Sequence, residues 1–270
     1  GRLGMQLKPL QDKEKAGRLT EQEAGQKAVL EEAYAVDVFD LADRAEDAKL
    51  VVRGERFYEA EKLELALNTF REAMQYISAA YYPASLVFYP MESNLGYRPG
   101  VSKEVFACLD DEQVNVYRDI CNQLVLPSVS KEKPTVIGIS IGTQMQLMAG
   151  LTFCKMIKES FPDIHVVVGG NVVTRLQEEW AKHERFFTEV FDAAILYEGE
   201  HALLWYIEAV NGQRAIESVP NLMYYESGAV QQSKEVYTEK TAALPLPDFD
   251  GLPLDHYFVP ERIIPYLATR

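Results

Sequence analysis

A regular alternation of short apolar runs and helical patterns between residues 134 and 225 restricts the possible folds more than any other feature of this 270-residue chain. Residues 135–141, Thr-Val-Ile-Gly-Ile-Ser-Ile, are mostly β-branched, which predicts a parallel strand buried on both faces. The same criteria predict strands at 164–168, 193–196 and 221–225 and helices at 146–161, 174–183 and 200–210. This order predicts an α/β fold with a Rossmann-like or flavodoxin-like, doubly wound and mostly parallel sheet.

The first half of the chain is less regular and predicts an added helical region. Residues 1–33 are rich in Lys, Glu, Gln and Ala, which predicts a helical or mobile arm. Residues 34–130 predict a helix-rich region that packs on the α/β domain, with strands at 36–41 and 85–89, a helix at 59–80, a capped helix or a helix pair at 102–125, and a loop at 90–100. The α/β domain would span residues 131–228. Residues 229–270 would complete a hairpin, turning at Ser227-Gly228, and then form a linker.

Charge and cysteine content disfavour several classes of function. With 27 basic and 41 acidic residues the net charge is −14, so neither nucleic acid nor a membrane surface is an expected partner. No apolar run reaches the ~18 residues of a membrane span. Cys108, Cys121 and Cys154 lack the spacing of a metal motif, which predicts buried thiols and a cytoplasmic location. No histidine pairs with another metal ligand at helical spacing, so no metal site is predicted.

Three loops at the carboxyl ends of the predicted strands form the candidate cofactor site. Ligands of open parallel sheets bind at this edge, where loop backbones and helix N-termini converge. Glycines let the backbone approach a bulky ligand, and hydroxyl or amide side chains bond its polar groups. Alternatively, the glycines only form tight turns. The candidate binding residues are Ser140, Gly142, Thr143 and Gln144 in the first loop, Gly169, Gly170 and Asn171 in the second, and Tyr197, Glu198, Gly199 and Glu200 in the third.

Four elements in this order resemble the cobalamin-binding region of B12-dependent radical SAM proteins. Ser140-Ile141-Gly142 and Gly169-Gly170, separated by the 26 residues 143–168, resemble that family's Ser-x-Leu and Gly-Gly signature, with Gly142 in place of Leu. The loop at residues 197–200, Tyr-Glu-Gly-Glu, resembles its Gly-Glu-Gly-Glu element. Residues 244–252, Tyr257 and residues 264–270 are similar to the linker that enters the radical SAM barrel.

The resemblance implies that the α/β domain holds cobalamin ahead of a carboxyl-terminal radical SAM barrel of the same protein, its expected partner. That barrel, not this chain, would bind S-adenosylmethionine and a [4Fe–4S] cluster, since the family's CxxxCxxC motif would follow Arg270. The implied reaction class is methyl transfer to an unactivated carbon or phosphorus centre. The residues that correspond to the family's Asp-x-His-x-x-Gly loop, 93–98, contain no histidine, so the expected cobalamin is base-off without a histidine lower ligand.

Two other functions are compatible with these residues. A cofactor-free α/β interaction or substrate-gating domain attached to the same barrel is favoured by Gly142 and by the missing histidine. A flavodoxin-type nucleotide or flavin module would use the same loops but would need more aromatic or phosphate-cradling residues there. The resemblance also implies an upstream strand before 36–41, without which the sheet is incomplete or is completed by residues 85–89.

Overall fold

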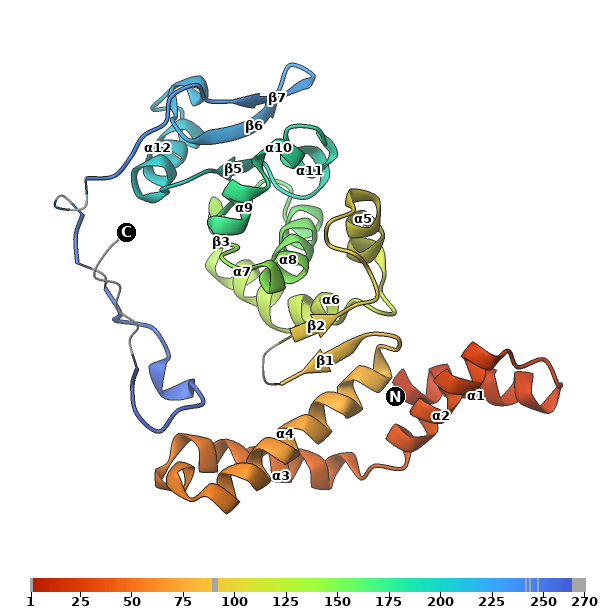
Figure 1. Cartoon of the computed structure of the whole chain (residues 1–270). Helices are drawn as coiled ribbons and strands as arrows, with labels where there is room; N and C mark the ends of the chain where they lie inside the picture. The colour runs from red at the N-terminus through yellow and green to blue at the C-terminus, as the bar shows by residue number, and fades with distance from the viewer. Residues whose placement is uncertain (1, 89–91, 241, 243, 247, 264–270) are drawn as a thin grey trace. The chain divides into compact units, whose positions relative to one another are not determined.

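The computed structural model describes residues 2–88, 92–240, 242, 244–246 and 248–263 and divides into two compact units (Figure 1). The helical unit comprises residues 1–96 and 247–270. The α/β unit comprises residues 97–246, so residues 97–130 belong to the same unit as the main sheet.

The helical unit is built on four helices and a hairpin. Thr20 and Glu23 form a capping box at the start of its second helix, where the Thr20 hydroxyl accepts a hydrogen bond from the Glu23 N–H. The predicted helix at 59–80 is confirmed as α4. The elements are α1 (Arg2–Lys15), α2 (Glu21–Tyr34), α3 (Val38–Arg53), η1 (Glu55–Tyr58), α4 (Ala60–Ala80), β1 (Ser85–Val87), β2 (Glu92–Asn94) and η6 (Leu254–His256).

The strand predicted at 36–41 is wrong, because these residues begin helix α3. Asp37 is the N-cap, and its Oδ1 accepts hydrogen bonds from the N–H groups of Phe39 at 3.0 Å and Asp40 at 3.2 Å. Leu41 and Ala48, seven residues apart, are both buried on one face of the helix. The alternation of apolar and acidic residues was therefore a cap followed by the first turn of an amphipathic helix.

The strand predicted at 85–89 is confirmed in part as β1, and its last residue, Tyr89, lies outside the described residues. β1 pairs antiparallel with β2, with Leu86 opposite Ser93, inside a segment predicted to be loop. The two strands form a separate sheet, so β1 does not complete the main one.

Within the helical unit, residues 254–261 contact η1 through a hydrogen bond from the Tyr58 hydroxyl to Glu261 at 3.0 Å, and contact α3 and α4 through an aromatic clasp formed by Phe258 with Phe70, Phe88 and Arg53. The Phe258 ring stacks on Phe70 at 5.2 Å between centroids and lies 5.8 Å from Phe88. The Arg53 guanidinium lies 5.1 Å from the Phe258 ring and donates to the His256 carbonyl at 2.7 Å. These contacts join residues about 200 positions apart, so the unit is discontinuous in sequence.

Phe258→Ala is expected to loosen the clasp. The variant would lose two ring contacts and one cation–π contact. Because the Phe258 side chain is 37% exposed, we expect this loss to lower the free energy of local opening by only about 1.4 kcal/mol. Hydrogen–deuterium exchange across residues 252–263 should then be roughly tenfold faster. Phe249→Ala is the matched control, because Phe249 has the same exposed fraction and no ring contact among the described residues. Equal exchange in the two variants would contradict the clasp.

The α/β unit alternates strands and helices as predicted, with some differences in bounds. Helix 200–210 is confirmed with the predicted bounds, and the segment 102–125, predicted as a helix or a helix pair, forms two short helices followed by a π-helical turn. The elements are α5 (Ser102–Asp110), α6 (Val116–Ile120), the π-helical η2 (Cys121–Val125), α7 (Leu126–Glu132), β3 (Val136–Ser140), η3 (Gln144–Gln146), α8 (Leu147–Ser160), β4 (His165–Gly169), α9 (Asn171–Arg175), α10 (Gln177–Trp180), α11 (Arg185–Glu189), β5 (Ala193–Ile195), α12 (Glu200–Val210), η4 (Ile216–Ser218), β6 (Leu222–Glu226) and β7 (Ala229–Gln232).

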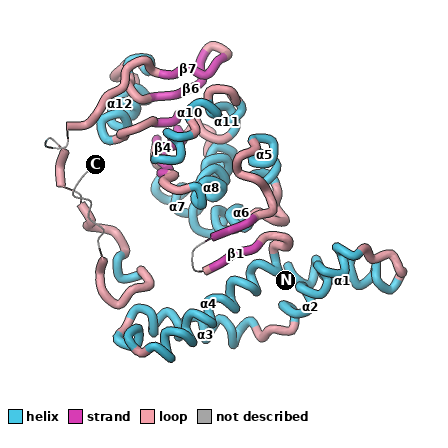
Figure 2. The backbone as a smooth tube through the Cα atoms, in the orientation of Figure 1, coloured by secondary structure: helices cyan, strands magenta, loops and turns pink. Residues whose placement is uncertain are grey.

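The main sheet has the strand order β3-β4-β5-β6-β7 and is mixed (strands are magenta in Figure 2). β3, β4 and β5 are parallel, as predicted. β6 is antiparallel to β5, with Leu222 opposite Ile195, so a parallel fourth strand was wrong. The connection after α12 returns the chain to the carboxyl end of β5, where β6 therefore begins. The predicted hairpin is confirmed, since β7 pairs antiparallel with β6 around Ser227-Gly228.

Helices cover both faces of this sheet, but β3 is less buried than predicted. On one face, Ala202 and Tyr206 of α12 pack in a buried cluster with Val167 of β4. On the other, a Cβ at Gly150 of α8 would lie 3.6 Å from the side chain of Ile139 in β3. β3 is an edge strand whose residues are half-buried or exposed, and among the described residues no strand pairs with its free edge. Burial of β3 on both faces is therefore wrong.

The three cysteines are free and buried, as predicted. Burial raises the pKa of each thiol, to about 12 for Cys108 and about 11 for Cys121, because the thiolate loses its hydration. They are inert packing groups in the α/β unit.

Candidate functional site

The loops after β3 and β4 are held together at the carboxyl edge of the sheet. The Ile141 N–H donates to the Gly169 carbonyl at 2.7 Å, and the Val172 N–H donates to the Ile141 carbonyl at 3.2 Å. Gly170 has φ +106°, and a Cβ there would lie 2.7 Å from the Ile141 carbonyl oxygen. Glycine is required at 170 because the backbone of the neighbouring loop occupies the space that a side chain would need.

Three of the predicted site residues at this edge carry polar side chains that the fold does not use. Ser140, Gln144 and Asn171 are exposed, and none of them has a side-chain hydrogen bond among the described residues. They lie at or just beyond the ends of two adjacent parallel strands, so one polar ligand could reach all three side chains from solvent.

The other two predicted residues of the first loop serve the fold. Thr143 caps the turn that leads into α8, and the amide oxygen of Gln146 accepts hydrogen bonds from the N–H groups of Gly142 at 2.9 Å and Thr143 at 3.1 Å. Sequence reasoning missed Gln146, although Thr-x-x-Gln is a recognisable capping box. These two backbone N–H groups are thus already satisfied.

The third loop, residues 197–200, is fixed by hydrogen bonds to three residues that the sequence did not single out, Thr174, Gln177 and Glu239. Tyr197 has φ +59°, its N–H donates to the Thr174 hydroxyl at 2.7 Å, and its own hydroxyl donates to the Gln177 amide oxygen at 3.1 Å. Glu198 accepts a hydrogen bond from the Glu239 N–H. Gly199 directly precedes α12. Glu200 is the first residue of this helix, where its carboxylate interacts favourably with the helix dipole.

Asn221 joins this loop to the irregular segment around Tyr237. Its side-chain amide donates to the carbonyls of Glu198 at 3.1 Å and Tyr237 at 2.8 Å, and its Oδ1 accepts from the Tyr237 N–H at 2.9 Å. Asn221 is 2% exposed and has φ +59°, a conformation that asparagine tolerates better than most residues. Its side chain therefore satisfies three backbone groups at once.

Buried Glu239 holds His201 at the start of α12. The carboxylate accepts from the His201 N–H at 2.9 Å and lies 2.6 Å from its Nδ1, while the Glu239 side chain is 1% exposed and that of His201 39%. A carboxylate on one ring nitrogen is also typical of metal-binding histidines. However, the described residues contain no group of three metal-ligating side chains. No local pattern could have linked two residues 38 positions apart.

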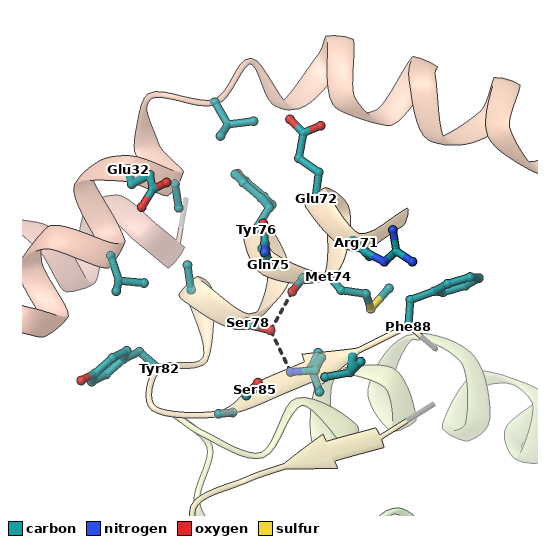
Figure 3. Close-up of a pocket in the computed structure, with 17 residues that line it drawn as sticks. Glu32, Arg71, Glu72, Met74, Gln75, Tyr76, Ser78, Tyr82, Ser85 and Phe88 are labelled. Carbon is teal, nitrogen blue, oxygen red and sulfur yellow. Dashed lines mark hydrogen bonds between the residues drawn. The ribbon is translucent and has the colours of Figure 1, made fainter. Parts of the chain in front are cut away.

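A separate hollow of about 650 Å³ lies in the helical unit (Figure 3). Sequence reasoning did not predict it, because its walls come from three elements that are distant in sequence. Residues of α2, α4 and β1 and of the connections beside them line it: Val29, Glu32, Ala33, Val36, Arg71, Glu72, Met74, Gln75, Tyr76, Ser78, Ala79, Tyr82, Ala84, Ser85, Leu86, Val87 and Phe88.

In the described part of the chain, no helix combines the length and the apolar character needed to cross a membrane. Comparisons with protein-family models, curated proteins and solved structures found no match to this chain.

Proposed function

We propose that this chain is the cobalamin-binding region of a B12-dependent radical SAM enzyme. The observation that carries the proposal is the pair of loops after β3 and β4, held in contact through Gly170 and presenting the exposed side chains of Ser140, Gln144 and Asn171 at the carboxyl edge. The signature-like spacing from Ser140 to Gly170 is the second support.

These residues fit the polar periphery of a corrinoid. Its side-chain amides and phosphate need hydrogen-bonding partners that the fold has not already used, and the three side chains supply them. A doubly wound sheet is part of the proposal. It would place a further strand at the free edge of β3, and ligands of such sheets bind where the strand order reverses.

Bound cobalamin would supply methyl-carrier chemistry, and the chain would bind and orient it. The radical SAM barrel of the same protein, with S-adenosylmethionine and [4Fe–4S], would be the partner that uses it. We expect no histidine below the cobalt. Without nitrogen ligation, the EPR spectrum of bound Co(II) cobalamin should lack nitrogen superhyperfine splitting. Any nitrogen splitting would contradict the base-off proposal: splitting that His201→Ala removes would come from that histidine, and splitting that persists would come from another nitrogen ligand, such as the dimethylbenzimidazole of cobalamin itself.

Titration with hydroxocobalamin tests the proposal directly. The wild-type chain should retain the corrin near stoichiometry after desalting. The triple variant Ser140→Ala, Gln144→Ala, Asn171→Ala should bind roughly a hundredfold more weakly, since each lost hydrogen bond is worth about 1 kcal/mol. The fold should be unaffected, because these side chains are exposed and unbonded in the described structure.

A matched control keeps the residue types but moves them away from the edge. Ser130, Gln123 and Asn122 are exposed in the same unit, and their combined replacement by alanine should leave retention unchanged. An intact wild-type fold that retains no corrin would overturn the proposal.

One observation favours a cofactor-free interaction or gating domain as the second candidate. The backbone donors of Gly142 and Thr143 are satisfied internally by Gln146, and Glu198 is occupied by the Glu239 backbone. Some of the hydrogen-bonding groups at the candidate edge are therefore already used within the fold. Failure to bind corrin, together with a normal fold, would favour this candidate.

A further inference from the structure

The hollow in the helical unit is a trough whose floor is helix α4 (Figure 3). Helix α2 and the residue Val36 after it form one wall, and strand β1 forms the other. Its volume of about 650 Å³ lies within the ~300–1,000 Å³ typical of binding sites. Its location in a different unit from the candidate cofactor edge makes it a second, independent site.

The floor and the β1 wall are fixed to each other without any ligand. The Ser78 hydroxyl donates to the Met74 carbonyl at 2.6 Å and accepts from the Leu86 N–H at 2.9 Å, as the dashed lines in Figure 3 show. The central backbone donor of β1 is therefore used. A bound molecule would be recognised by side chains and not by addition of a strand to β1.

The middle of the trough is apolar and its two ends carry opposite charges. Figure 3 shows Tyr76 between Glu32 at one end and Arg71 with Phe88 at the other. Neither charge is neutralised by an ion pair within the described residues: the Arg71 guanidinium bonds only the Asn68 amide oxygen, and Glu32 has no basic partner. The third charge, Glu72, is already paired with Arg44 at 2.7 Å.

We propose that this trough binds a short, extended peptide segment of a partner protein. The segment is apolar in its centre, with a basic residue at the end that meets Glu32 and an acidic residue at the end that meets Arg71. The apolar residues displace water from the trough, and the two charges set the register. This inference is independent of the proposed cobalamin function.

Charge reversal in the full chain tests the proposal. Three dye-labelled peptides share the centre Leu-Phe-Leu and are flanked by Lys and Glu, by two Glu or by two Lys; fluorescence anisotropy measures their affinity. The wild type should bind the mixed peptide about tenfold more tightly than the doubly acidic one. Glu32→Lys should shift preference to the doubly acidic peptide, and Arg71→Glu to the doubly basic one, each by about tenfold.

Two control variants distinguish the effect of the charges in the trough from the effect of a change in the net charge of the chain. Glu64→Lys and Arg56→Glu change the net charge equally at exposed positions of the same unit that do not line the trough, so they should leave the preference of the wild type unchanged. Circular dichroism confirms folding of each variant. The proposal is overturned if none of the three peptides binds the folded wild type, or if the controls shift preference as much as the trough variants.

Discussion

Asn221→Ala is expected to lower the free energy of unfolding of the α/β unit by about 3–5 kcal/mol. The carbonyls of Glu198 and Tyr237 and the Tyr237 N–H would lose their partner in a buried site, at roughly 1–3 kcal/mol for each unsatisfied group. The left-handed backbone conformation at φ +59° costs alanine about 1 kcal/mol more, because its Cβ crowds the following carbonyl. Urea unfolding followed by tryptophan fluorescence measures this, because both tryptophans, Trp180 and Trp205, lie in the α/β unit.

Two further variants assign that loss to its causes. Asn221→Gly keeps the left-handed conformation but removes the side chain, so it should lose about 1 kcal/mol less than alanine does. Asn122→Ala, at an exposed position of the same unit, should stay within about 0.5 kcal/mol of the wild type. A loss below about 1 kcal/mol for Asn221→Ala would show that the three hydrogen bonds are not formed.

Gly170→Ala is the second large effect, at about 3 kcal/mol. A Cβ at this position has two costs: it lies 2.7 Å from the Ile141 carbonyl oxygen, and φ is +106°. Backbone atoms cannot give way as the end of a side chain does, so the loops after β3 and β4 must separate. The same urea unfolding measures the loss.

Gly228→Ala is the control for Gly170. Its φ is +84°, but nothing lies within 4 Å of the added Cβ, so only the conformational cost of about 1 kcal/mol applies. If Gly170→Ala and Gly228→Ala lower the free energy of unfolding equally, the loops after β3 and β4 are not in contact at Gly170. Because Gly170→Ala disturbs the fold, the exposed triple variant remains the cleaner test of corrin binding.

The parts of the fold that local sequence determines were predictable. β4 and α12 lie within a residue of their predicted bounds, because a run of valines favours a strand and Glu200 opens an apolar helical pattern. The direction of β6 was not predictable, since a strand's own residues do not specify whether it runs parallel to its neighbour. The exposure of β3 likewise depends on strand order, which the apolar run does not contain.

In the candidate site, too, one part was predictable from the sequence and another was not. Placement of its loops at one sheet edge followed from the order of elements, and the structure bears this out for the loops after β3 and β4. The order of elements does not indicate which side chains remain free to bind a ligand and which are used in hydrogen bonds within the fold. Thr143 is used in a cap that was readable, whereas Glu198 is used by Glu239, 41 residues away. Contacts of that separation have no local signature.

The clasp on Phe258 has a consequence for the order of folding. Phe70 and Phe88 are synthesised long before the Phe258 ring that packs against both, and all of residues 97–246 emerge in between. The α/β unit is contiguous and can fold as it is made, whereas the helical unit is completed only after residues 254–261 have been synthesised. Until then the Phe70 and Phe88 rings, whose centroids lie 4.6 Å apart, lack the third ring that packs against them, and nascent chains interrupted before residue 258 expose apolar surface that chaperones should recognise.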